Sequence, residues 1–196
     1  MPAKLTLITA PAVEPVSVND VLEHSRIDDS TEENLIRRLI RAARQEAENI
    51  TGRALITQTW KLNLNEFPGN GYGSITLPRP PLQSISSVTY LDTNGATQSL
   101  TDSPTSNWIL VSGEPTVMTP DYDVTWPSTY DVPDAVSIRF ICGYGDDPED
   151  VPDPIRQWIL IHAATMYEYR EASFERPLTP HTFVDRLLDS YRTCWF

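Results

Sequence analysis

The chain has 196 residues, of which 40% are hydrophobic and 21% are charged. It is long enough to bury a core without disulfide or metal staples. Its formal net charge of −12 argues against a protein that holds nucleic acid by neutralising phosphates. No stretch reaches the roughly 18 apolar residues of a membrane span, and the first residues lack the apolar run of a signal peptide. Cys142 and Cys194 lack metal-type spacing, so we expect synthesis in a reducing cytoplasm.

The first predicted elements are a short strand or extended arm over residues 4–9 and a short helix that opens at Ser17. Asp20 follows Ser17 at the spacing of a capping box, in which each side chain binds the backbone N–H of the other residue. A polar run over residues 28–31 then leads to a second helix. Because the joint is short, we expect the two helices to pack as a pair.

The segment 30–60 is the one around which the chain is organised, because a long helix ends there at a glycine and passes into a strand. Ser30 or Thr31 is the expected N-cap, with Glu33 as the capping-box partner of Ser30. Gly52 is expected at the left-handed position just past the helix. The predicted helix has about 20 residues. Its apolar face has the spacing of one helical stripe and comprises Ile36, Ile40, Ala43, Ala47 and Ile50.

Residues 54–142 predict a meander of short strands in an antiparallel sandwich or open barrel. The pattern there changes to alternation, first over residues 56–64 and finally at Val136, Ile138, Phe140 and Cys142. Thr-Asn-Gly at 93–95 predicts a hairpin between strands at 84–92 and 96–100. Residues 108–111 and 116–118 predict a further strand pair.

Helical patterns return after residue 153. Pro154 suits the first turn of a helix that we expect to end near Ala172. A last helix is predicted from Thr179 or Thr182, with Phe183, Leu187, Leu188 and Tyr191 on its apolar face. The order of helices, strands and helices predicts an α+β fold: a helical bundle built from the N- and C-terminal helices, with an inserted antiparallel β region. The expected division is 1–53 with 153–196 as the helical part, and 54–152 as the β insertion.

A catalytic site is hard to assemble from this sequence, so we expect no enzyme, no cofactor and no metal. His162 lies on an apolar helix face and is expected to be a core residue rather than a base. No nucleophile-elbow, zinc-protease or phosphate-loop motif occurs. The acidic run over residues 146–153 is expected to be a solvated loop, because it lacks the ligand spacing and central glycine of a calcium-binding loop.

Two other features leave alternatives open. Arg37, Arg41 and Arg44 form a basic stripe at i, i+4 and i+7, which is either a solvated face with local pairs to glutamates or a contact with acid on a neighbouring copy. DNA contact is the weaker alternative, given the overall charge. Near residue 196, a group of large side chains either docks on the protein's own core or anchors a partner. That group comprises Tyr191, Arg192, Trp195 and Phe196.

Four segments together resemble the head–tail connector (adaptor) proteins of long-tailed bacteriophages, in the variant with a β insertion that also occurs in prophages and gene-transfer particles. The resemblance runs in the same order from residue 5 to about 172. Each segment is structural rather than catalytic, and the combination carries the resemblance. The segments are LTLITAP, TGRALITQTW, LPRPPLQSISSVTYLD followed by Asn-Gly, and GYGDDPEDVPDPIRQWIL.

The resemblance implies a non-enzymatic protein of the virion neck, between capsid and tail. Such adaptors form a ring, usually of twelve copies, beneath the portal, extend the DNA channel and present the docking surface for the stopper or tail. The implied partners are further copies of the chain, the portal, and stopper or tail proteins, while genomic DNA passes through the lumen without specific binding and no membrane is involved. On this basis we expect Arg37, Arg41 and Arg44 at or near subunit contacts. Tyr191, Arg192, Trp195 and Phe196 are then expected to bind the portal.

Two other functions remain as alternatives. One is a different neck or tail component, such as a stopper. The other is a β-sandwich module that binds a glycan or receptor, in which Trp60, Trp108 or Trp126 would be an exposed stacking platform. Trp60 lies on the apolar side of its predicted strand, so we expect it in the core.

Overall fold

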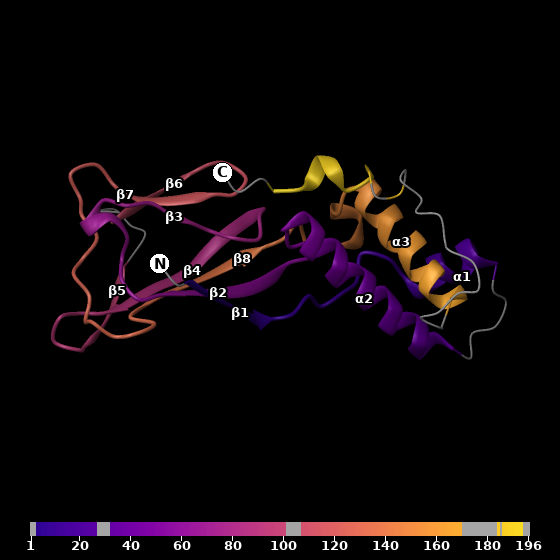
Figure 1. The fold of residues 1–196 in the computed structure, drawn as a ribbon, viewed down its shortest axis with the longest axis horizontal. Helices are drawn as coiled ribbons and strands as arrows, with labels where there is room; N and C mark the ends of the chain where they lie inside the picture. Colours follow the sequence, from indigo (N-terminus) through magenta and orange to yellow (C-terminus); the bar gives the residue numbers. More distant parts are fainter. Residues whose placement is uncertain (1–2, 27–31, 101–106, 170–183, 185, 194–196) are drawn as a thin grey trace. The chain divides into compact units, whose positions relative to one another are not determined.

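The computed structural model describes residues 3–26, 32–100, 107–169, 184 and 186–193. Within these residues the chain forms eight β-strands and three α-helices (Figure 1). They belong to two units, each of which is described on its own. The sheet unit comprises Met1–Ala10 and Thr57–Gly143, and the helical unit comprises Pro11–Ile56 and Tyr144–Phe196.

The larger sheet of the sheet unit has five antiparallel strands in the order β1-β2-β8-β4-β5. The alternation predicted for the last strand is confirmed, because every second residue of β8 is completely buried. In the pairing of β2 with β8, Leu62 stands opposite Ile138, so both strands contribute apolar side chains to one core. The five strands are β1 (Ala3–Thr9), β2 (Gln58–Leu64), β4 (Leu82–Leu91), β5 (Thr97–Leu100) and β8 (Val136–Cys142).

The hairpin predicted at Thr-Asn-Gly is confirmed, since β4 and β5 pair across it and Gly95 has a left-handed φ of 80°. The side chain of Asp92 stabilises the turn. Its Oδ1 accepts from the backbone N–H of Asn94 at 2.9 Å and of Ala96 at 3.0 Å, and its Oδ2 accepts from Nε2 of Gln98 at 2.9 Å. The bond from Gln98, followed by that from Ala96, holds the pKa of Asp92 below its ordinary value.

The smaller sheet has three antiparallel strands in the order β3-β7-β6. They are β3 (Ile75–Thr76), β7 (Val117–Pro120) and β6 (Trp108–Val111). The predicted pairing of residues 108–111 with 116–118 is thus confirmed. Phe67 stacks on Trp126 with ring centroids 4.9 Å apart and meets Tyr90 of β4 edge-on at 5.7 Å. This aromatic cluster ties the loops after β2 and β7 to the larger sheet.

The helical unit contains α1 (Val18–Ser25), α2 (Glu33–Thr51) and α3 (Asp153–Glu168). The capping box of α1 is confirmed, because Ser17 N–H donates to Asp20 Oδ2 at 2.8 Å and Asp20 N–H donates to Ser17 Oγ at 3.1 Å. Gly52 ends α2 in the left-handed conformation, as predicted, with a φ of 73°. The predicted caps at residues 30 and 31 lie outside the described residues. Within the described part of the chain, none of the helices has the length and hydropathy to cross a membrane.

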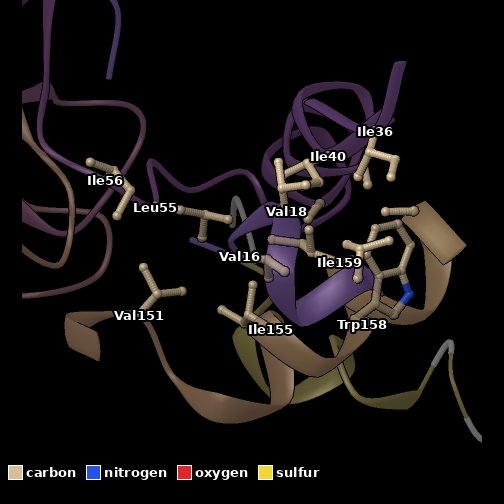
Figure 2. Close-up of a cluster of buried hydrophobic side chains, with 14 of the residues drawn as sticks. Val16, Val18, Ile36, Ile40, Leu55, Ile56, Val151, Ile155, Trp158 and Ile159 are labelled. Atoms are coloured by element: carbon tan, nitrogen blue, oxygen red, sulfur yellow. The ribbon is translucent and has the colours of Figure 1, made fainter. Parts of the chain in front are cut away.

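The core of the helical unit is built by its helices together with the segments that join them (Figure 2). Ile36 and Ile40 come from α2, and Ile155, Trp158 and Ile159 come from α3, all at most 1% exposed. The predicted apolar face of α2 is therefore confirmed. The joining segments add a second group of buried side chains, which comprises Val16, Leu55, Ile56 and Val151.

The predicted architecture, a helical bundle made from both ends of the chain, is wrong. The described residues form mainly two antiparallel sheets, with three helices of which α1 has only eight residues. Most of the predicted last helix lies outside the described residues; Val184 and Arg186 are helical, and the one-turn 3₁₀ helix η3 (Asp189–Tyr191) follows. In this region Leu188 is fully buried, and Thr193 bonds to the end of α2.

Candidate functional site

The residues considered for chemistry have structural roles. The ring of His162 stacks on that of Trp158, with centroids 3.9 Å apart and planes 15° apart. In the acidic run, Asp147 and Asp150 form a reciprocal cap around η2 (Pro148–Asp150), in which Asp147 N–H donates to Asp150 Oδ2 at 3.1 Å. Among the described residues, no three His, Cys, Asp or Glu side chains are arranged to hold a metal ion. The pairing of Asp147 with Asp150 organises the backbone of the acidic run.

The three arginines of the predicted stripe lie on α2 in different environments. Arg37 pairs with Glu33 at 3.3 Å, and its side chain is 62% exposed. The Arg41 side chain is 64% exposed and its Nε lies 3.7 Å from Oε1 of Glu14. Arg44 is only 5% exposed. The first two guanidinium groups therefore face solvent, whereas the third belongs to the interior of the unit.

Arg44 is the centre of a buried network that joins three parts of the helical unit. Its Nε lies 2.7 Å from Oε2 of Glu14, which belongs to the segment before α1. Its NH1 lies 2.7 Å from Oε2 of Glu48, one turn further along α2. The other carboxylate oxygen of Glu48 accepts the backbone N–H of Leu55 at 3.2 Å. Arg44 thus fixes the chain both before α1 and after α2, where charge-assisted hydrogen bonds are strongest because water is excluded.

A second set of contacts holds residues 191–193 at the carboxyl end of α2; we call it the C-terminal clamp and define it by Thr51, Arg53, Tyr191 and Thr193. Arg53 Nε donates to the backbone carbonyl of Tyr191 at 2.6 Å. The carbonyl of Thr51 accepts from Thr193 twice, from its backbone N–H at 2.9 Å and from its Oγ1 at 3.1 Å. The clamp therefore binds mainly backbone atoms of the C-terminal segment.

Of the predicted portal-binding residues, Tyr191 and Arg192 lie in the described part of the chain. Tyr191 is half-buried and packs against the helical core, whereas Arg192 is exposed and pairs with Asp189 at 3.3 Å. Trp195 and Phe196 lie outside the described residues. Arg53 and Glu14 were not singled out from the sequence. Arg53 could have been found from its position directly after Gly52, because a cation near the end of a helix interacts favourably with the last backbone carbonyls.

Trp108 and Trp126 are buried and do not form an exposed platform. Trp108 is 5% exposed and Trp126 is 4% exposed, and the indole N–H of Trp126 donates to the carbonyl of Gly73 at 2.7 Å. The expectation that Trp60 lies in the core is wrong, because it is only half-buried. The guanidinium of Arg79 lies 5.4 Å from the centroid of the Trp60 ring and covers one of its faces. These positions disfavour a glycan site built on Trp108 or Trp126.

Comparison with solved structures finds the same fold in gene transfer agent (GTA) particles. A chain in the virion of a native GTA particle has 22% identity and a TM-score of 0.78, over 98% of this chain and 96% of that one. A chain in the neck of an empty GTA particle, computed with C6 symmetry, has 22% identity and a TM-score of 0.80, over 98% and 97%. A chain in the neck of a native GTA particle, computed with C12 symmetry, has 21% identity and a TM-score of 0.73, over 98% of this chain and 97% of that one. No protein-family model and no curated protein matches the chain.

Proposed function

We propose that this chain is a structural, non-enzymatic component of a virion neck and that within the neck it acts as the head–tail adaptor. The observation that carries the proposal is that 98% of the chain has the same fold as proteins of GTA particles. Two of these solved structures are particle necks. The adaptor role itself comes from the sequence resemblance described above. In this role the protein lies beneath the portal, extends the DNA channel and presents the docking surface for the stopper or tail.

A ring of copies is part of the proposal, and the C6 and C12 symmetry of the two neck structures supports it. Twelve copies is the number that the adaptor resemblance implies. In a cyclic ring each subunit uses two different surfaces, one for each neighbour. We assign Arg37 and Arg41 to one of these surfaces, because their side chains are more than half exposed and acid on a neighbouring copy can reach them beside their partners Glu33 and Glu14. Arg44 supports that surface from within the subunit.

Charge reversal at both exposed arginines, Arg37→Glu with Arg41→Glu, is expected to weaken ring formation about tenfold, because like charges then face each other across the contact. Mass photometry of mixtures with portal oligomers gives the number of copies bound per portal. The wild-type protein is expected to fill the ring, and the variant to give incomplete rings at the same concentration.

The matched control is Lys61→Glu with Arg139→Glu, which changes the net charge equally. Lys61 and Arg139 are opposite each other on β2 and β8, so the control keeps two like charges adjacent while it changes the sheet unit alone. The control is expected to fill the ring. Complete rings from the Arg37 and Arg41 variant would contradict the assignment of the contact.

The acidity of the chain fits the proposed channel, since a net charge of −12 disfavours retention of DNA in the lumen.

A stopper is the second candidate, because the two neck structures that share the fold do not say which position in the neck the matching chain occupies. Mixing the purified protein with portal oligomers separates the two roles. An adaptor binds the portal directly, whereas a stopper binds only when another neck protein is already in place.

A further inference from the structure

We propose that the arginine face of α2 in one copy docks into an acidic groove between α1 and α3 of the next copy. The arginine face is defined by Arg37, Arg38 and Arg41, which are all exposed on α2. The inference rests on the ring of the proposed function, which it deepens by naming the acid that the arginines meet. A cyclic ring needs two different surfaces on each subunit, and this pair of surfaces supplies both.

The acidic groove is an open hollow of about 790 Å³ in the surface of the helical unit. Its lining residues come from α1, from the first two turns of α3, and from Val16 and Leu187. None of the described residues that line it belongs to α2. The groove and the arginine face are therefore separate surfaces of one unit, so that both can be used at the same time by two different neighbours.

The lining of the groove has an excess of negative charge. Asp20 and Glu23 lie one turn apart on α1, and Asp153 lies at the start of α3 with its side chain 94% exposed. The same lining contains one guanidinium, that of Arg156. It is already bound within the chain, because its Nε donates to the carbonyl of Pro15 at 3.3 Å and its NH1 donates to Oδ1 of Asp153 at 3.4 Å. The groove thus offers carboxylates to a cationic partner.

Partly exposed apolar side chains give the groove a second kind of contact. Leu160 and Leu187 line it and are only partly buried against the helical core. The aliphatic stems of arginines can cover such side chains while their guanidinium groups reach carboxylates. Small-molecule sites of this volume are mostly apolar and surround their ligand, so an open, acid-lined groove fits a protein surface better.

The arginine face is complementary to this groove. Arg37 and Arg41 lie one turn apart on α2, with side chains that are 62% and 64% exposed. Glu33 lies 3.3 Å from Arg37, and Glu14 lies 3.7 Å from Arg41. Exposed pairs of this kind contribute little to stability, so the guanidinium groups can turn to acid on another copy. A helix that lays one face in a groove is a recurrent mode of protein recognition.

Mixing two charge-reversed variants tests the pairing directly. The groove variant carries Glu23→Arg with Asp153→Arg, and the face variant carries Arg37→Glu with Arg41→Glu. Each alone is expected to self-associate about tenfold more weakly than the wild-type protein, because its contacts bring like charges together. In an equal mixture, a contact between the two variants joins either two unchanged surfaces or two reversed ones. Both combinations are complementary, so sedimentation velocity of the mixed full-length proteins is expected to show wild-type association.

The matched control is Asp146→Arg with Glu149→Arg, which reverses two exposed acids of the same unit outside the groove lining. It is expected to associate like the wild-type protein and to give no recovery when mixed with the face variant. A melting curve of each variant tests the fold, and Glu23→Arg alone is the second groove variant if the double substitution does not fold.

Three results would overturn the inference. Wild-type association by the groove variant would exclude the groove as the partner surface. A mixture that associates no better than its two components would exclude the pairing of these two surfaces. Wild-type protein that stays monomeric up to about 1 mM would exclude a contact of useful strength between copies. The adaptor role is measured separately, because association that recovers in the mixture without binding to portal oligomers would refute that role and leave this contact in place.

Discussion

Replacement of both Trp195 and Phe196 by alanine is expected to reduce attachment to the portal by at least about a hundredfold while the fold remains intact. Large aromatic side chains dominate the energetics of protein contacts, where a single hot-spot residue contributes about 2 kcal/mol or more. Since the C-terminal clamp holds residues 191–193 by backbone bonds, loss of the two aromatic side chains leaves its contacts in place. The measurement is binding of the purified variant to portal oligomers, with circular dichroism and melting as the test of the fold.

Cys194→Ser is the matched control for this variant, because it alters the residue between the clamp and the aromatic pair without removing an aromatic ring. It is expected to attach like the wild-type protein. Wild-type attachment by the double alanine variant would exclude an aromatic anchor at residues 195 and 196. The same attachment combined with normal ring formation would direct the search for the portal contact to another surface of the subunit.

Arg44→Met is expected to destabilise the helical unit by about 3–5 kcal/mol, because it leaves the buried carboxylate of Glu48 without its cation. Arg37→Met, on the same helix, is expected to cost less than about 1 kcal/mol, since that ion pair is largely exposed. Urea unfolding followed by circular dichroism measures both. The comparison keeps the residue type, the helix and the substitution constant, and it varies the burial of the arginine and the number of its ion pairs.

The physical reason can be checked with a second substitution. Adding Glu48→Gln to Arg44→Met removes the unpaired buried charge, so the double variant is expected to recover part of the lost stability. If Arg44→Met and Arg37→Met lose the same stability, Arg44 is not the buried centre of the network. Arg44 would then be a candidate for direct ring contact, together with Arg37 and Arg41.

The features predicted correctly from sequence are those set by residues close together in the chain. The capping box of Ser17 with Asp20, the left-handed Gly52 and the turn at Gly95 each depend on a few neighbouring residues. The alternation in β8 likewise identified its buried face. These local patterns predicted the positions of α1, α2, β5 and β8.

Features that depend on contacts between distant residues could not be predicted from local sequence patterns. The arginine spacing placed Arg44 on one helical face with Arg37 and Arg41, but its burial depends on Glu14, 30 residues away. Likewise, no local pattern shows that β4 pairs with β8 or that strands divide between two sheets. The helical pattern predicted after residue 179 likewise gave no sign that Thr193 bonds to Thr51, 142 residues away. In each case the deciding contact lies outside the window in which periodicity is measured.

The central claim, that this chain forms a neck ring at the portal, is tested most directly by cryo-electron microscopy of purified particles that contain it. The account predicts density for repeated copies of the two units in a ring that touches the portal and surrounds the DNA channel. Twelve copies are expected in that ring. Density for the chain at a peripheral fibre, or at a position in the tail without contact to the portal, would contradict the account.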